Sequence, residues 1–238
     1  MALILNIETS TIVCSVSVSR DGIVLAVKES REEKSHAKSL TIFIDEILKE
    51  LNYKIDDLDA VAISKGPGSY TGLRIGVSTA KGLCYAKDLP LIAINTLQSM
   101  ATGMILKFNT NELPVDNFET AILVPMIDAR RMEVYSAFFN SKGESVREVL
   151  AEIIDEHSYK DILSKQKMIF FGDGSEKIRE TIQHENAIFI GDIYPSSNDM
   201  AELSENAYQK REFENVAYFE PFYLKDFVAT VPKKNIFQ

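Results

Sequence analysis

Residues 65–76 of this chain read Lys65-Gly66-Pro67-Gly68-Ser69-Tyr70-Thr71-Gly72-Leu73-Arg74-Ile75-Gly76. Four of the chain's 11 glycines fall within this stretch. It follows an apolar run over 58–64 that predicts a β-strand, and it opens a pattern over 71–86 that predicts a helix. Glycine is used where backbone passes close to another group or adopts a positive φ. The sequence therefore predicts a tight turn that holds a ligand or admits a second surface.

Spacing excludes a P-loop here and gives only weak support to a dinucleotide-binding turn. A P-loop requires Gly-Lys-Ser/Thr after its last glycine, whereas Gly72 is followed by Leu73. The dinucleotide fingerprint G-x-G-x-x-G requires two residues before its third glycine, whereas three separate Gly68 from Gly72. The glycines of this turn therefore do not match either phosphate cradle.

A stripe of small residues offers a third interpretation. Gly72, Gly76 and Ala80 recur every four residues and so share one face of the predicted helix. Such a stripe favours close helix contact, either inside the domain or at a subunit interface. A second predicted helix, beginning near His36, places Ile42 opposite its apolar face, where it would be exposed in a monomer. We take Ile42, Gly72, Gly76 and Ala80 as candidate interface residues.

Composition restricts the class of protein. The chain has 238 residues, 45% of them hydrophobic, and a net charge of −9. An acidic chain does not grip a nucleic-acid backbone unaided, because that affinity comes mainly from Lys and Arg. Cys14 and Cys84 do not form a disulfide framework. No signal peptide and no apolar run of membrane-spanning length is evident, so we expect a soluble, cytoplasmic protein.

The layout of the first thirty residues returns later in the chain. Strand, acidic turn, strand, glycine hairpin and strand are predicted over 3–27 and again over 121–150. A polar segment at 109–119 separates the two copies. We therefore expect two related α/β domains facing a cleft, at 1–106 and 107–238, with the C-terminal helix packing back on the first.

Two carboxylates end equivalent predicted strands. Glu8 and Asp128 would point into the cleft, where paired carboxylates could hold a magnesium–nucleotide. Ser10 and Arg130 lie in the turns that follow, but neither turn contains the glycine that would admit phosphates. These four residues are candidates for a vestigial nucleotide cleft. A small-molecule kinase or ATPase that uses Glu8 and Asp128 is the alternative function.

Metal and nucleophile chemistry find little support in the sequence. The chain has three histidines, none of them four residues from another: His36, His157 and His184. This spacing excludes a helical pair of metal ligands, and no metal site is predicted. His36 is expected at a helix start with its ring in solvent. No base can be named for Ser69, so Ser69 and Thr71 are predicted as turn and helix-cap hydroxyls, and no catalytic residue is assigned.

The stretch from Gly66 to Gly76 resembles the GPGSFTGLRIG signature of the TsaB (YeaZ) family. Its signature-turn residues here are Gly66, Pro67, Gly68, Ser69, Tyr70, Thr71 and Arg74. Other blocks that resemble the family lie at 5–11, 90–97, 126–135 and 221–224, so the likeness is spread over nearly the whole chain. The family usually carries Asp where this chain has Glu8.

The resemblance implies a fold and a role. The fold would be an actin-like/sugar-kinase-like (ASKHA) α/β fold of duplicated ribonuclease H-like domains, with mixed sheets flanked by helices. The role would be that of a non-catalytic activating subunit in making N6-threonylcarbamoyladenosine beside the anticodon of ANN-decoding tRNAs. It would dock helix-to-helix on a TsaD-like catalytic subunit, or on itself, and a TsaE-like ATPase would join them. ATP/ADP and metal would lie on the partners, with no cofactor on this chain alone, and tRNA would be reached only through the complex.

Overall fold

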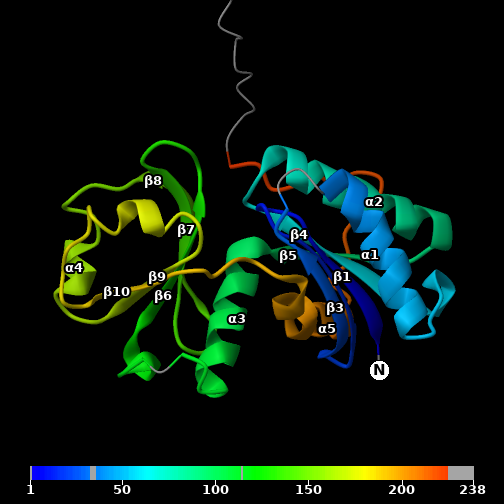
Figure 1. Cartoon of the computed structure of the whole chain (residues 1–238), viewed down its shortest axis with the longest axis horizontal. Helices are drawn as coiled ribbons and strands as arrows, with labels where there is room; N and C mark the ends of the chain where they lie inside the picture. Colours follow the sequence, from blue (N-terminus) through cyan, green and yellow to red (C-terminus); the bar gives the residue numbers. More distant parts are fainter. Residues whose placement is uncertain (1, 33–35, 114, 225–238) are drawn as a thin grey trace, which may run out of the picture.

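The computed structural model describes residues 2–32, 36–113 and 115–224 and contains two mixed β-sheets flanked by helices (Figure 1). The strands of the first sheet are β1 (Leu3–Glu8), β2 (Cys14–Arg20), β3 (Ile23–Ser30), β4 (Ala60–Gly66) and β5 (Leu91–Asn95). Those of the second are β6 (Ile122–Asp128), β7 (Glu133–Phe139), β8 (Ser145–Ile153), β9 (Met168–Phe171) and β10 (Ala187–Ile190).

The helices connect and cover these strands. The α-helices are α1 (His36–Glu50), α2 (Tyr70–Lys87), α3 (Thr96–Asn109), α4 (Lys160–Leu163) and α5 (Ala201–Lys210). The short 3₁₀ turns are η1 (Ile55–Asp57), η2 (Phe118–Thr120), η3 (Glu176–Ile178) and η4 (Ser197–Met200). No helix within the described ranges is long and apolar enough to cross a membrane.

The two sheets repeat one topology. The first has the order β3-β2-β1-β4-β5, and the second, read from its other edge, has the equivalent order β8-β7-β6-β9-β10. In each, the first strand is antiparallel to the second and parallel to the fourth. The predicted duplicated ASKHA-like α/β fold is confirmed. The central strand β1 is buried along its whole length, which explains its mainly apolar sequence; Asn6 and Glu8 are the buried polar exceptions.

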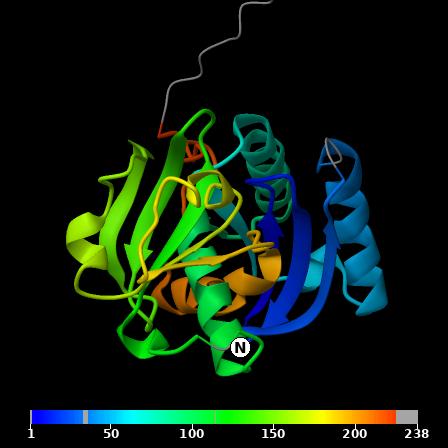
Figure 2. The ribbon, with the colours of Figure 1, turned by 60° about the vertical axis from the view of Figure 1, so that its left-hand side comes forward.

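Helices divide the faces of the first sheet between them. α1 and α2 cover the face turned away from the second sheet, and α3 and α5 lie between the two halves (Figures 1 and 2). α5 packs on β5 and β1, where its Ala207 joins a core cluster with Ile4 and Ile92. α3 contacts β4 and β5 of the first sheet and also β6 and β7 of the second. The halves are thus joined by helices on their inner faces.

One local expectation proves wrong. The ring of His36 is buried rather than in solvent, and its Nε2 lies 3.2 Å from the carbonyl oxygen of Val13, just before β2. The last helical segment consists of η4 followed directly by α5, and Ser196 caps its start, because its hydroxyl accepts from Asn198 N at 3.3 Å.

Candidate functional site

The signature turn joins β4 to α2. Gly66 has a φ of +108°, which glycine adopts without strain, and the Gly66–Pro67 peptide bond is cis. Ser69 then caps α2, because its hydroxyl accepts from Gly72 N at 3.3 Å. Ser69 is the helix cap, as predicted, whereas Thr71 lies exposed in the first turn of the helix.

The glycines of this turn pack against the turn that follows β1. A Cβ atom on Gly68 would lie 2.3 Å from the carbonyl oxygen of Ser10, and one on Gly72 would lie 2.1 Å from that of Thr9. On Gly76 it would lie 2.2 Å from Thr9 Oγ1. All three separations are far below van der Waals contact. The glycines are therefore needed so that α2 can lie directly on residues 9 and 10.

The predicted interface stripe is consequently turned inward. Gly72, Gly76 and Ala80 are buried within the chain, on the face of α2 that packs against the first sheet. They cannot present a surface to a partner, so their role as interface residues is corrected to packing inside the domain. Ile42, in contrast, is 46% exposed on α1, as its helical phase predicted.

Glu8, the last residue of β1, is buried next to the turn that the glycines contact. Its Oε1 accepts from Ser10 N at 2.5 Å and from the Ser64 hydroxyl at 2.9 Å, and within the described part of the chain no hydrogen bond reaches Oε2. Burial raises the pKa of the Glu8 carboxyl above its usual value. Glu8 and Ser10 are completely buried. This end of the expected cleft therefore offers no open ligand position for a magnesium–nucleotide.

Asp128 lies in a different environment at the end of β6. It is exposed, and it forms an ion pair with Lys177. Its Oδ1 also accepts from Arg130 N at 2.8 Å, and its own N–H donates to Asp173 Oδ1 at 3.0 Å. Arg130 and Arg131 both have positive φ, 71° and 53°. Asp128, the second carboxylate expected to hold a magnesium–nucleotide, thus has Lys177 as its ion-pair partner.

Among the residues that the structure describes, no three His, Cys, Asp or Glu side chains are grouped to hold a metal ion. Cys14 and Cys84 are buried thiols, and burial raises the pKa of Cys14 to about 11 and that of Cys84 to about 12. Neither thiol is therefore a ready nucleophile.

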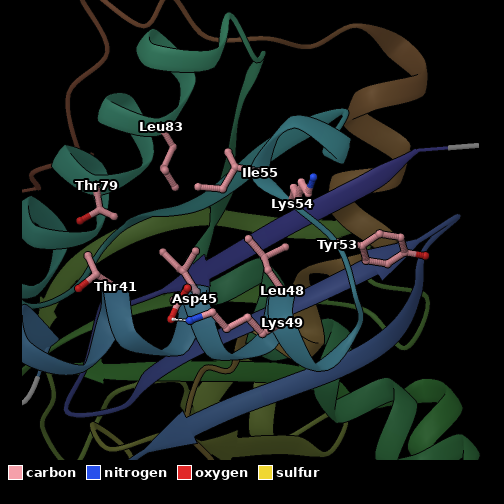
Figure 3. Close-up of a pocket in the computed structure, with 10 residues that line it drawn as sticks. Thr41, Asp45, Leu48, Lys49, Tyr53, Lys54, Ile55, Thr79 and Leu83 are labelled. Carbon is pink, nitrogen blue, oxygen red and sulfur yellow. Dashed lines mark hydrogen bonds and ion pairs between the residues drawn. The ribbon is translucent and has the colours of Figure 1, made fainter.

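An open groove lies between α1, η1 and α2, on the outer face of the first half (Figure 3). Its volume is about 380 Å³, and it is lined mainly by apolar side chains, with an ion pair between Asp45 and Lys49 at 2.7 Å on one wall. The lining residues are Thr41, Ile44, Asp45, Leu48, Lys49, Tyr53, Lys54, Ile55, Thr79 and Leu83. We call this the docking groove.

Beside the docking groove, α2 presents a second row of small residues. Ser78, Gly82 and Ala86 are exposed and spaced by four, and among the residues with described positions none lies within 4 Å of a Cβ atom built on Gly82, its own helix aside. Glycine in a helix interior costs ~1 kcal/mol of stability relative to alanine. No close contact among the described residues requires position 82 to lack a side chain. Tyr85 stands 86% exposed on the same side of the helix.

Comparison with known proteins identifies the family. The family model described as TsaD, tRNA N6-adenosine threonylcarbamoyltransferase, matches residues 27–233. The tRNA threonylcarbamoyladenosine biosynthesis protein TsaB of Escherichia coli is 31% identical over 236 residues, covering 95% of this chain and 96% of that protein. The chain belongs to the TsaB (YeaZ) family, within the wider family of that model. TsaB of Haemophilus influenzae is 29% identical over 244 residues, covering 95% of this chain and 94% of that protein.

A solved structure supports the fold of this TsaB-family chain. The crystal structure of a Pseudomonas aeruginosa protein with similarity to the peptidase YeaZ superposes with a TM-score of 0.80 at 22% identity. The match covers 94% of this chain and 100% of that one. The two proteins therefore share their fold across both halves.

Sequence reasoning missed the outward row of this TsaB-family chain. Ser78, Gly82 and Ala86 follow the same four-residue period as Gly72 and Gly76, so spacing alone could not choose between the two faces. The signal that could have separated them is Tyr85, a large aromatic residue next to the outward row. The inward row instead borders Leu73 and Val77, which are buried.

Proposed function

We propose that this chain serves tRNA threonylcarbamoyladenosine biosynthesis as a non-catalytic activating subunit that docks on a TsaD-like catalytic partner. The proposal rests on one contrast: Glu8 is completely buried, whereas α1 and α2 present an open apolar surface. A kinase or ATPase would need its carboxylate at the cleft, and here Glu8 is completely buried. The chemistry is therefore assigned to the partner.

The docking face that we propose consists of the docking groove and the outward row of α2. Small residues at four-residue spacing let two helices approach closely, and a groove of apolar side chains suits the apolar face of an amphipathic helix. Ile42 on α1 and Tyr85 on α2 supply exposed apolar anchors at its edges. This composition favours a helical partner rather than a small polar ligand.

The other components of the proposal follow from charge and exposure. A face with this much exposed apolar surface favours self-association when the chain is alone. ATP/ADP and metal are assigned to the TsaD-like subunit and to a TsaE-like ATPase that joins the complex. With a net charge of −9, the chain is expected to reach tRNA only through that complex.

Gly82→Arg tests the proposal. A long charged side chain on the outward row blocks close helix approach, and we expect the affinity for the TsaD-like partner to fall by at least tenfold in isothermal titration calorimetry. Gly82→Ala is the matched control, because its single methyl leaves most of the space open, and its affinity should change by less than threefold.

Both variants should keep the circular dichroism spectrum of the parent, since a Cβ atom on Gly82 would meet no atom of another described element within 4 Å. Full partner affinity in Gly82→Arg would overturn the proposed face. Micromolar binding of magnesium–ATP to the isolated chain would overturn the non-catalytic assignment and revive the kinase alternative.

A further inference from the structure

The two edges of the first sheet differ in what covers them. At the β5 edge, Glu214 N donates to the carbonyl oxygen of Leu91 at 2.8 Å, so the chain after α5 covers the start of this strand. At the opposite edge, β3 pairs with β2 alone among the described strands. Within the described part of the chain, no other backbone hydrogen bond reaches β3. Its outer N–H and C=O groups are therefore open to pairing with a further strand.

β3 also carries a row of exposed apolar side chains. Ile23, Leu25 and Val27 are 69%, 40% and 46% exposed, and their alternate positions put them on one face of the sheet. The positions between them face α1, because Ala26 packs on the first core and Lys28 forms ion pairs with α1. Natural edge strands are commonly protected by charged residues or proline. The stretch from the first to the last residue of the exposed row contains neither.

We infer that β3 pairs antiparallel with β3 of a second copy of this chain, about a two-fold axis at Ala26, so that the first sheets of the two copies join edge to edge. This pairing concerns the isolated chain and does not rest on the proposed function.

The order of residues along β3 favours a second copy as the occupant. A two-fold axis perpendicular to the sheet at Ala26 places each odd position opposite an odd position, so the exposed rows of the two copies meet on one face. Leu25 of each copy then lies opposite Val27 of the other. The two apolar rows become one continuous apolar strip, and each copy removes part of the other's exposed row from water.

Charge favours this register over its neighbour. With the axis one residue earlier, Glu29 would lie opposite Asp21, and like charges directly opposite each other destabilise a sheet. In the inferred register, Glu29 lies opposite Ile23 instead. Continued past the strand ends, the same register sets Asp21 of one copy against Arg31 of the other, two charges of opposite sign. The charged residues at both ends of the row therefore match those of a second copy.

The β3 edge and the docking groove lie on different sides of α1. Lys28 of β3 pairs with Glu46 and Glu50, at 3.8 Å and 3.0 Å, and neither glutamate lines the groove. Thr41 and Asp45 of α1 line it instead. Pairing through β3 therefore leaves the docking groove open, and the two surfaces can be tested separately.

Disulfide trapping tests the register. Residue 26 faces its own copy across the axis, with Cα atoms ~4.5–5.5 Å apart, a separation that a disulfide can bridge. Ala26→Cys should therefore give a covalent dimer on mild oxidation, detected by non-reducing electrophoresis. Val24→Cys is the matched control on the same face, because its two copies lie ~14 Å apart along the strands and should not be linked.

The parent chain supplies the background of this experiment, since Cys14 and Cys84 are buried. Absence of a covalent dimer in Ala26→Cys, or an equal yield in Val24→Cys, would overturn the inferred pairing.

Sedimentation velocity tests the surface itself. Gly82→Arg is used as the background, because it blocks close approach to α2 and so removes self-association through the docking face. This variant should still form a dimer whose fraction rises with concentration. Adding Leu25→Lys, which places a charge in the exposed row, should raise the dissociation constant at least tenfold.

Val146→Lys is the matched control for Leu25→Lys. Val146 is 55% exposed on β8, the edge strand of the second sheet, and its replacement should change the dissociation constant less than threefold. A Gly82→Arg chain that stays monomeric at every concentration, or equal effects of the two lysines, would overturn pairing through β3. Neither result bears on binding to the TsaD-like partner, so the proposed function stands or fails separately.

Discussion

An added methyl group should have opposite effects in the two rows of small residues on α2, the inward row with Gly76 and the outward row with Gly82. A Cβ atom on Gly76 would lie 2.2 Å from Thr9 Oγ1 and 2.9 Å from Ile63 Cδ1, whereas one on Gly82 would meet no other described element within 4 Å. Overpacking a core in this way costs ~1–3 kcal/mol. Replacing an exposed helical glycine by alanine gains up to ~1 kcal/mol. The same substitution should therefore have opposite signs at two positions of one helix.

Urea unfolding of Gly76→Ala and Gly82→Ala checks this prediction. The midpoint should fall for Gly76→Ala and rise slightly for Gly82→Ala, with the m-value unchanged in both. Because the two substitutions are chemically identical, differences in the unfolded chain largely cancel. A loss of stability at Gly82 as large as that at Gly76 would mean that the two faces of α2 have been assigned the wrong way round.

For single residues, the sequence correctly predicted the position in a strand or on a helix face, but it did not predict burial or ion pairing. The period of Gly72, Gly76 and Ala80 correctly placed them on one face, but a period does not say which face meets the sheet. Glu8 and Asp128 do end equivalent strands, yet one is sealed and the other pairs with Lys177. Burial and pairing depend on residues far away in the chain, which local patterns do not report.

Among the elements, α2 depends on its cap. Ser69 accepts from Gly72 N, and an N-cap serine replaced by alanine typically costs ~1 kcal/mol. Ser69→Ala should lower the thermal midpoint, while Ser69→Asp, another good cap, should largely preserve it. Thr71→Ala is the matched control, because Thr71 is exposed in the first turn and should shift stability by less than ~0.5 kcal/mol. Equal losses in Ser69→Ala and Thr71→Ala would contradict the cap assignment.

Element boundaries could be predicted where nearby residues determine them, and not where residues distant in the chain do. The signature turn and its helix could be predicted, because glycine, proline and a capping serine act within a few residues. The split of the last helix into η4 and α5 could not, since Ser197 is held by Ser15 of β2, with 2.7 Å between their hydroxyl oxygens. His36 does begin α1, as predicted, but the burial of its ring was missed for the same reason, because the carbonyl that meets the ring lies 23 residues earlier in the chain.

At the scale of the whole molecule, a half-buried carboxylate lies where η4 packs on α3 and the first sheet. Asp199 of η4 lies against Gly103 of α3, where an added Cβ atom would be 2.3 Å from Asp199 Oδ2. Asn198 donates to Oδ1 at 3.2 Å, Lys107 faces it from α3, and Glu29 and Glu8 face it from the first sheet. Burial, with those two carboxylates, outweighs Asn198 and Lys107 and raises the pKa of Asp199 from 3.8 to about 6.

This raised pKa makes the packing of η4 on α3 and the first sheet sensitive to pH. The folded state holds the Asp199 proton more tightly than the unfolded state, so the free energy of unfolding falls as the pH rises from 3.8 to about 6. Asp199→Asn removes this loss and should be more stable than the parent at pH 7 by about 1 kcal/mol, allowing for solvent screening. At pH 4 the advantage should disappear, because Asp199 is then protonated in the folded parent. Thermal unfolding at both values, with Asp192→Asn as an exposed control, checks the difference, and an equal shift at pH 4 and pH 7 would rule Asp199 out as its source.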